Sequence, residues 1–339
     1  MTTEGTVNGE ADAATFERLR QARPRVRAEL GKIVVGQEEP VSQLLTAMFA
    51  GGHCLIHGPL ATGKTVLVDA VARVMDLSFK RIQFTPDLMP SDISGAEVLE
   101  EDQSGHRVTR FVKGPVFCNI LMADEINRTP PKTQAALLEV MQEKQVTLGG
   151  RSHPLPAPFY VLATQVSMEQ EGTYPLPEAQ QDRFMLSILM DYLPEKDEGA
   201  IVRQSTGLER PAVERVIGAR DLLDFQRAVR SVQLPPAVGK YIVDLVDSTR
   251  PTVKGAPDFV KEYVIWGAGL RASQNIALAA KSAAAQEGRR SVALADVKKV
   301  LIPVLRHRVV LSFRAEVDKL TVEDVVRQLI ERVPAPQAA

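Results

Sequence analysis

The chain has 339 residues, of which 45% are hydrophobic and 24% are charged, and its formal net charge is −1. These values are ordinary for a globular protein of about two domains, and they exclude collagen-like, disulfide-rich and wholly disordered chains. The balanced charge also argues against a dedicated nucleic-acid or membrane-surface binder.

The two cysteines, Cys54 and Cys118, lie in apolar runs without metal-ligand spacing, and the five histidines show no such spacing either. We expect both thiols to be buried and reduced. Residues 1–14 lack the apolar stretch of a signal peptide, and no apolar run reaches the ~20 residues of a membrane span. The sequence therefore predicts a cytoplasmic protein without a membrane span.

Residues 1–14 are predicted to be a disordered tail. From residue 15 to residue 195, apolar helix patterns alternate with short apolar strands, which is typical of a parallel sheet with right-handed crossovers. The predicted strands are 53–57, 79–84, 117–123, 159–164 and 184–190, and the predicted helices are 15–33, 40–50, 67–75 and 133–142. Two segments with turn residues, 97–111 and 145–155, are predicted as hairpins inserted into this core.

The pattern changes after residue 195. Residues 196–220 are predicted as a linker, and residues 221–339 as an all-α domain that buries the single Trp266. Its predicted helices are 221–229, 236–249, 271–286, 293–307 and 322–333. The fold class is therefore α/β, with a five-stranded parallel core that carries two inserted hairpins and precedes a helical domain.

A phosphate-binding loop directly follows the predicted strand 53–57. It fits G-x-x-x-x-G-K-[ST] and consists of Gly58, Pro59, Leu60, Ala61, Thr62, Gly63, Lys64 and Thr65. Between a strand and a helix, the loop N–H groups surround phosphates and the helix N-terminus adds partial positive charge. Lys64 would reach the β- and γ-phosphates, and the Thr65 hydroxyl would ligate Mg²⁺. The alternative is a chance match in a loop, which the flanking strand and helix disfavour.

Two carboxylates end the apolar strand 117–123. At the carboxyl end of a strand beside the phosphate loop, Asp124 can hold the hydration shell of Mg²⁺, and Glu125 can orient and deprotonate a water that attacks the γ-phosphate. The alternative is a solvated strand end followed by a helix cap, but the phosphate loop favours catalysis. We therefore predict ATP and Mg²⁺ as cofactors.

With both motifs, the chain resembles the MoxR family of AAA+ ATPases from about residue 34 to residue 333. The resemblance rests on the segments 34–37, 81–88, 114–117, 124–128, 132–139, 169–180, 182–184 and 304–308. It implies an AAA+ αβ core with a helical lid and assembly into a homo-oligomeric, usually hexameric ring. It also implies chaperone-like action on a protein client together with a von Willebrand factor A domain partner.

The resemblance places an arginine finger at Arg183, and the planar charged fork of arginine suits a transferring phosphoryl group on the neighbouring subunit. It places sensor 2, a residue that senses the γ-phosphate, at Arg271. The alternatives are a surface salt bridge for Arg183 and a solvated helix residue for Arg271. The cluster Arg306-His307-Arg308 either contacts a partner or is a solvated helix end, and we favour the solvated end.

The sequence departs from the family at two positions. Ala61 replaces a usual glycine, which would cost roughly 1–2 kcal/mol if that position needs positive φ. Val166 replaces the asparagine of sensor 1, and valine offers no hydrogen bond to the attacking water. Since losing one preorganised polar contact costs about 10²–10³ in rate, we expect intact nucleotide binding and slow hydrolysis.

Three functions follow from these features. The leading prediction is an ATPase that remodels or activates a protein client. The first alternative, favoured by Val166, is an assembly module in which ATP holds a ring together with little turnover. The second is a nucleic-acid translocase, which the balanced charge disfavours.

Overall fold

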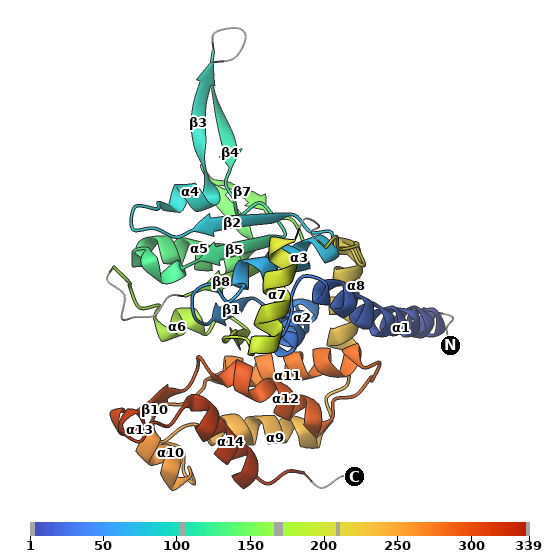
Figure 1. The fold of residues 1–339 in the computed structure, drawn as a ribbon, viewed down its shortest axis with the longest axis vertical. Coiled ribbons are helices and arrows are strands. Elements are labelled where there is room, and N and C mark those ends of the chain that lie inside the picture. Colours follow the sequence, from blue (N-terminus) through green and yellow to red (C-terminus); the bar gives the residue numbers. More distant parts are fainter. Residues whose placement is uncertain (1–3, 102–105, 166–171, 208–210, 337–339) are drawn as a thin grey trace.

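The computed structural model describes residues 4–101, 106–165, 172–207 and 211–336. A sheet core with helices on both faces forms one part, and a mostly helical lid packs beneath it (Figure 1). Among the described residues, no helix combines the length and the apolar character needed to cross a membrane.

The core contains one five-stranded parallel sheet, as the sequence predicts. Its strand order is β2-β5-β8-β1-β9. The strands are β1 (Cys54–His57), β2 (Phe79–Gln83), β5 (Ile120–Asp124), β8 (Tyr160–Thr164) and β9 (Leu186–Leu189). β5 and β8 are buried along their whole length, because both faces of a parallel sheet are covered by its crossover helices.

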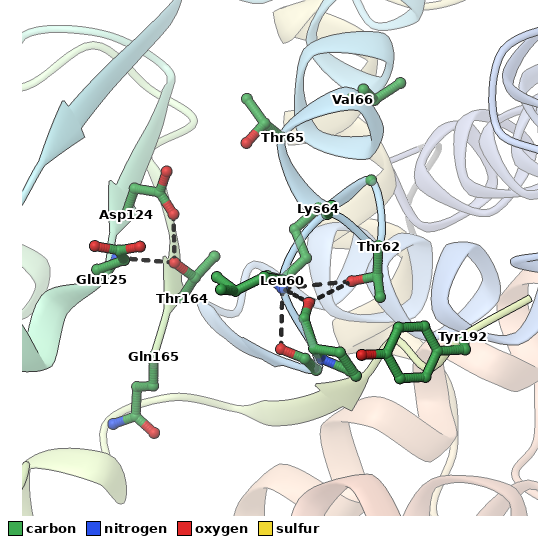
Figure 2. Close-up of a pocket in the computed structure, with 14 residues that line it drawn as sticks. Leu60, Thr62, Lys64, Thr65, Val66, Asp124, Glu125, Thr164, Gln165 and Tyr192 are labelled. Atoms are coloured by element: carbon green, nitrogen blue, oxygen red, sulfur yellow. Dashed lines mark hydrogen bonds between the residues drawn. The ribbon is translucent and has the colours of Figure 1, made fainter. Parts of the chain in front are cut away.

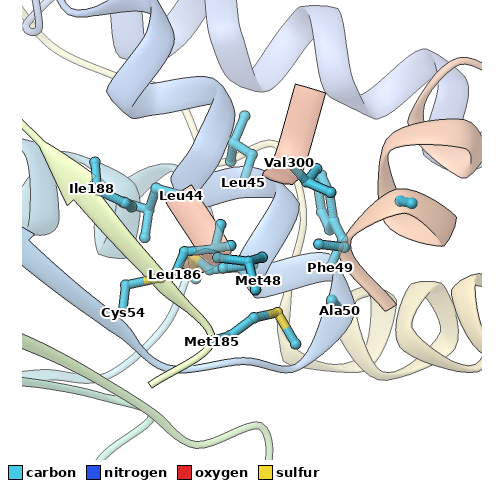
Figure 3. Packing of buried hydrophobic residues seen from close by; sticks show 14 of the residues in the cluster. Leu44, Leu45, Met48, Phe49, Ala50, Cys54, Met185, Leu186, Ile188 and Val300 are labelled. Carbon is cyan, nitrogen blue, oxygen red and sulfur yellow. The ribbon is translucent and has the colours of Figure 1, made fainter. Parts of the chain in front are cut away.

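Successive residues of β5 enter two different hydrophobic clusters. Ile120 and Met122 face the cluster that contains α2 (Glu38–Ala50), α3 (Lys64–Val74) and much of the lid. Leu121 and Ala123 face the cluster on the other side, which contains α5 (Pro131–Glu143). This alternation follows from the two-residue period of a strand. Figure 3 shows the first cluster, where α2 and β9 meet Val300 of the lid.

The two inserted hairpins are present. The strands β3 (Gly95–Glu101) and β4 (Arg107–Lys113) are antiparallel and project far from the core (Figure 1). The shorter pair is β6 (Gln145–Leu148) and β7 (Arg151–Pro154). The ring of Phe111 on β4 stacks on His153 of β7 with centroids 4.2 Å apart, so the two hairpins contact each other.

The lid is helical with one exception. Its helices are α8 (Ala219–Ser231), α9 (Pro236–Asp247), α10 (Asp258–Tyr263), α11 (Leu270–Gln286), α12 (Leu294–Leu305), α13 (Phe313–Val317) and α14 (Val322–Arg332). The strands β10 (Val264–Trp266) and β11 (Val310–Leu311) form a small antiparallel pair, so the prediction of an all-α domain is wrong in this detail. The prediction for Trp266 is also wrong, because its side chain is 69% exposed at the edge of that pair.

Helical structure begins earlier and extends further than the sequence predicts. Residues 4–14 are the first turns of α1 (Glu4–Gly31) rather than a disordered tail, because Phe16 and Leu19 are buried and fix the helix from which those turns extend. The predicted linker 196–220 contains α7 (Glu195–Thr206) and the start of α8. The core also contains the short helices α4 (Pro90–Ser94) and α6 (Glu178–Gln181) and the 3-10 helix η1 (Ile126–Arg128).

Candidate active site

The loop between β1 and α3 has the backbone that its glycines allow. A Cβ on Gly58 would lie 1.8 Å from the carbonyl oxygen of Met190, so only glycine fits there. Gly63 has a φ of 86° and Ala61 a φ of 62°. The sequence predicts strain at Ala61 if that position needs a positive φ. It has one, so alanine is disfavoured there.

Lys64 begins α3 and folds back over this loop (Figure 2). Its Nζ donates to the carbonyl oxygens of Gly58 at 3.0 Å and Pro59 at 2.6 Å. Burial lowers the pKa of Lys64, and the carboxylates of Asp124 and Glu125 oppose that shift. The ammonium group therefore lies between the loop and two negative charges, where phosphate oxygens would be its strongest acceptors.

Asp124, the last residue of β5, is connected to two neighbouring strands. The Thr164 hydroxyl at the end of β8 donates to Asp124 Oδ1 at 2.5 Å. Arg81 of β2 donates to Asp124 Oδ2 from Nε at 3.0 Å and from a second guanidinium nitrogen. These contacts hold a carboxylate of low exposure in one orientation at the edge of the sheet.

Glu125 follows directly and turns out of the strand with a φ of 57°. Its N–H donates to the Thr164 hydroxyl at 2.8 Å, so Thr164 joins both acidic residues. Gln83 Nε2 donates to Glu125 Oε2 at 2.7 Å, and Arg128 Nε lies 3.0 Å from the same oxygen. The carboxylate thus has a defined position at the carboxyl edge of the sheet.

The phosphate loop and the two acidic residues line one cavity of about 590 Å³. Every residue predicted to bind nucleotide or metal, from Gly58 to Thr65 together with Asp124, lines it, and so does Glu125. Sequence reasoning assigned no site role to Val66, Thr164, Gln165 and Tyr192, which also line it. Their positions in the sequence, beside the loop or at the end of a predicted parallel strand, could have indicated a place in the site. Ligands bind outside the carboxyl ends of such strands.

A second, apolar cavity of about 370 Å³ adjoins the first. The two share Tyr192 and four residues of the loop region: Ala61, Thr62, Gly63 and Val66. The rest of its lining comes mainly from the segment between α1 and α2 and from α7, including Val34, Val35 and Ile201. Two cavities therefore meet at the phosphate loop, and of the two only the larger is lined by Lys64, Asp124 and Glu125.

Comparisons with known proteins agree with this arrangement. Residues 53–186 match the ATPase family associated with various cellular activities (AAA), and residues 259–329 match the AAA lid domain. The chain is 41% identical over 309 residues to Chaperone MoxR1 of Mycobacterium tuberculosis, which covers 91% of this chain and 81% of that one. It is 32% identical over 341 residues to Protein MoxR of Methylorubrum extorquens, covering 94% and 96%.

The chain belongs to the MoxR family of AAA+ ATPases. Its fold also matches the crystal structure of a candidate ATPase from Cytophaga hutchinsonii, with a TM-score of 0.88 and 38% identity. That match covers 99% of this chain and 100% of the other.

The two arginines that the MoxR resemblance singles out lie outside both cavities as the structure describes them. Arg183 Nη1 donates to the carbonyl oxygen of Leu138 at 3.2 Å and to Gln142 Oε1, both on α5. Arg271, at the start of α11, donates to Asp182 Oδ2 at 2.9 Å. Val166, the position of the MoxR sensor 1, lies outside the described residues, and β8 ends before it at Thr164.

Proposed function

We propose that this chain binds ATP with Mg²⁺ in the larger cavity, hydrolyses it, and uses the cycle to remodel or activate a protein client. One observation carries the proposal. Lys64, Asp124 and Glu125, which lie as many as 61 positions apart in the sequence, line a single cavity around a glycine-rich loop. This is the arrangement that phosphoryl transfer needs, since its catalysis depends mainly on positioning and charge.

The two adjoining cavities suit the two ends of a nucleotide. The loop N–H groups and Lys64 would hold the triphosphate in the larger cavity. The apolar cavity lined by Val34, Val66 and Ile201 would take the base. Tyr192 borders both cavities and would lie where the base joins the rest of the nucleotide.

The residues present also fit a magnesium ion. The Thr65 hydroxyl lies on the side of α3 that faces Asp124 (Figure 2), and hydroxyl and carboxylate oxygens are the hard donors that Mg²⁺ takes beside phosphates and water. Within the described residues, no cluster of three acidic, histidine or cysteine side chains could hold a metal alone. Thr65 and Asp124 would therefore share the ion with the nucleotide. When bound, Mg²⁺ neutralises charge on the β- and γ-phosphate oxygens.

Glu125 is the proposed general base. Its carboxylate would orient a water and accept its proton as the water attacks the γ-phosphate. The contacts from Gln83 and Arg128 hold that carboxylate, and the Thr164 hydroxyl fixes its backbone. Arg271 is proposed to sense the γ-phosphate, which requires it to leave Asp182.

Arg183 is proposed to act on the nucleotide of a neighbouring subunit. Its place outside the described cavities of its own chain supports this role. We propose a homo-oligomeric ring, a hexamer, in which hydrolysis depends on assembly. A cytoplasmic location is part of the proposal and is supported by the two buried thiols, since burial raises the pKa of both Cys54 and Cys118.

The client and partner come from the MoxR family. The relative from Mycobacterium tuberculosis is named a chaperone, which supports chaperone-like action here. A von Willebrand factor A domain protein is the proposed partner. Val166 supports a second candidate, an assembly ring that binds ATP and turns it over slowly, and turnover per subunit separates the two.

Isothermal titration calorimetry with ATP and a non-hydrolysable analogue at millimolar magnesium tests the proposal. We expect binding heat and a measurable release of phosphate. Lys64→Ala removes the ammonium group at the loop and should abolish both, whereas Lys80→Ala changes an exposed lysine of β2 and should leave both unchanged. Absence of heat with the unmodified protein would overturn the proposal.

Assembly needs its own measurement. We expect native mass measurements to show a larger oligomer with ATP than without it. A protein that stays monomeric under all nucleotide conditions would contradict the role proposed for Arg183.

A further inference from the structure

The end of helix α12 is fastened to the core through three consecutive side chains. Arg306 donates to the carbonyl oxygen of Ser187, and His307 Nε2 lies 3.0 Å from that of Phe184. The side chain of Arg308 is only 2% exposed. The prediction that these residues form a solvated helix end is therefore wrong, because residues more than 100 positions earlier cover them.

Arg308 makes the most extensive of these contacts. Its Nε donates to Asp182 Oδ1 at 2.7 Å. Its Nη2 donates to the carbonyl oxygens of Asp182 at 2.9 Å and Phe184 at 2.6 Å, and its Nη1 donates to that of Met185 at 3.2 Å. The guanidinium therefore binds backbone on both sides of Arg183.

Asp182 is the anion that this buried cation requires. Burial lowers the pKa of Arg308, and the Asp182 carboxylate opposes that shift. Removing one member of a buried, hydrogen-bonded pair leaves the other charge uncompensated, so such a pair is far harder to open than a surface one. The Asp182 side chain is 28% exposed and its carboxylate also accepts from Arg271, so the buried guanidinium of Arg308 is what holds the turn 182–185 to the lid.

We propose that Arg308 is a positioning residue for Arg183, so that the lid of one subunit determines how well Arg183 reaches the nucleotide of its neighbour. The proposal rests on the trans role proposed for Arg183. The other contacts of Arg183, to Leu138 and Gln142, fix its guanidinium end. Arg308 fixes its backbone, and a shift there moves the whole side chain.

Mixed oligomers test this directly. A donor subunit carries Glu125→Gln and keeps Arg183, and an acceptor subunit carries Arg183→Ala and keeps Glu125. Each is inactive alone, and turnover of the mixture reports acceptor sites completed by the Arg183 of a donor. Adding Arg308→Lys to the donor keeps the charge beside Asp182 but loses the planar fork that binds the three carbonyl oxygens.

We expect Arg308→Lys in the donor to lower kcat of the mixture about 10- to 100-fold with KM unchanged, because small misplacements of a catalytic group have effects of that size. The same substitution in the acceptor should leave turnover unchanged, since that subunit lacks Arg183. Arg308→Gln, which removes the charge as well, should follow the same asymmetry. The matched control is Arg314→Gln in the donor, because Arg314 is a lid arginine that is 66% exposed.

An unchanged kcat in the donor arrangement overturns the proposal, and so do equal losses in both arrangements, which would mean that Arg308 only holds the lid in place. If the unmodified donor and acceptor fail to complement at all, Arg183 does not act across an interface and both proposals fall. The pattern of turnover therefore distinguishes the two failures.

Discussion

Two of the arginine–aspartate pairs that connect distant parts of this chain differ in how far the arginine is exposed. Arg81 pairs with Asp124 at the rim of the larger cavity, where the arginine side chain is 47% exposed. Arg308 pairs with Asp182 where the lid meets the core, and that arginine side chain is 2% exposed. Asp124 of the first pair lines the larger cavity, and neither residue of the second pair does.

The difference shows how similar side chains serve different purposes. A half-exposed arginine exchanges easily with water and ions, so Asp124 can release Arg81 and remain available to a metal. A buried arginine that also binds carbonyl oxygens does not exchange its partners in this way, so Arg308 can hold the lid and the core in a fixed arrangement. The residues around Asp124 should therefore control turnover, and the contacts of Arg308 should control stability and the geometry between subunits.

The largest effect should be the loss of turnover on substitution of Glu125. Glu125→Gln keeps the backbone contact to Thr164 and the size of the side chain but removes the base, so turnover should fall about 10²- to 10⁴-fold. ATP binding and the free energy of unfolding should stay unchanged. Phosphate release measures turnover, and calorimetry measures ATP binding. A loss of less than about tenfold would remove Glu125 from its role as base.

The second prediction compares the two pairs directly. Arg308→Ala leaves several carbonyl oxygens without their donor and leaves Asp182 with Arg271 as its remaining arginine partner, so the free energy of unfolding should fall by about 3–5 kcal/mol. Arg81→Ala should lower it by about 1 kcal/mol or less, since Asp124 keeps Thr164 and gains water. Urea unfolding of both variants provides the measurement. Equal losses of stability in the two variants would show that burial of the arginine does not decide how much each pair stabilises the fold.

Substitution of Val166 tests whether the missing sensor 1 asparagine slows hydrolysis. Val166→Asn restores the polar side chain typical of the MoxR family, so turnover should rise, by up to the factor of about 10²–10³ that one preorganised contact supplies. ATP affinity should change little. Val166→Leu, which stays apolar, is the matched control and should give no increase. Equal or lower turnover with asparagine would contradict slow hydrolysis caused by Val166.

The contact of His307 between the lid and the core also predicts that the free energy of unfolding depends on pH. His307 is buried, its Nε2 lies beside the Phe184 carbonyl oxygen, and no described residue binds its Nδ1, so burial holds its pKa well below the ordinary 6.5. Above pH 6.5 the ring is neutral in both states. Below it the unfolded chain takes up the proton first, so stability falls by about 1.4 kcal/mol per pH unit for this residue.

His307→Gln should therefore make the loss of stability between pH 6.5 and 5 shallower than in the unmodified protein. His53 and His57, whose pKa burial lowers to about 4, contribute losses of the same sign in both proteins. Urea unfolding across this range gives the two slopes. Identical slopes would show that His307 is protonated in the folded protein as readily as in the unfolded chain.

The smallest effect belongs to the phosphate loop. Ala61 has a φ of 62°, and glycine relieves that strain while adding freedom to the unfolded chain. Ala61→Gly should therefore raise the free energy of unfolding by about 0.5–1 kcal/mol, less than the full strain of a left-handed alanine. Thermal unfolding detects the shift. A lower stability of the glycine variant would mean that the loop of the folded protein does not strain alanine.

Much of the core follows from local patterns. The five strands, the hairpins and the phosphate loop were predictable because apolar runs, turn residues and a fixed motif each lie within a few neighbouring positions. The strand predicted at 117–123 is shorter, Ile120–Asp124, because residues 117 and 118 form turns and Asn119 binds Ser78. Thr164 and Tyr192 gave no motif, since only the parallel strands bring their chain positions to the cavity.

The amino-acid order by itself specified the parallel sheet, the phosphate-loop motif and the acidic pair, because each depends on residues that are close in the chain. Only the folded chain decided that Arg308 is buried against Asp182, that Arg271 meets the same carboxylate, and that Trp266 is exposed. Those outcomes depend on which surfaces meet when the lid packs on the core. A pattern along one helix predicts that a face is covered, but it does not identify the distant carbonyl groups that cover it.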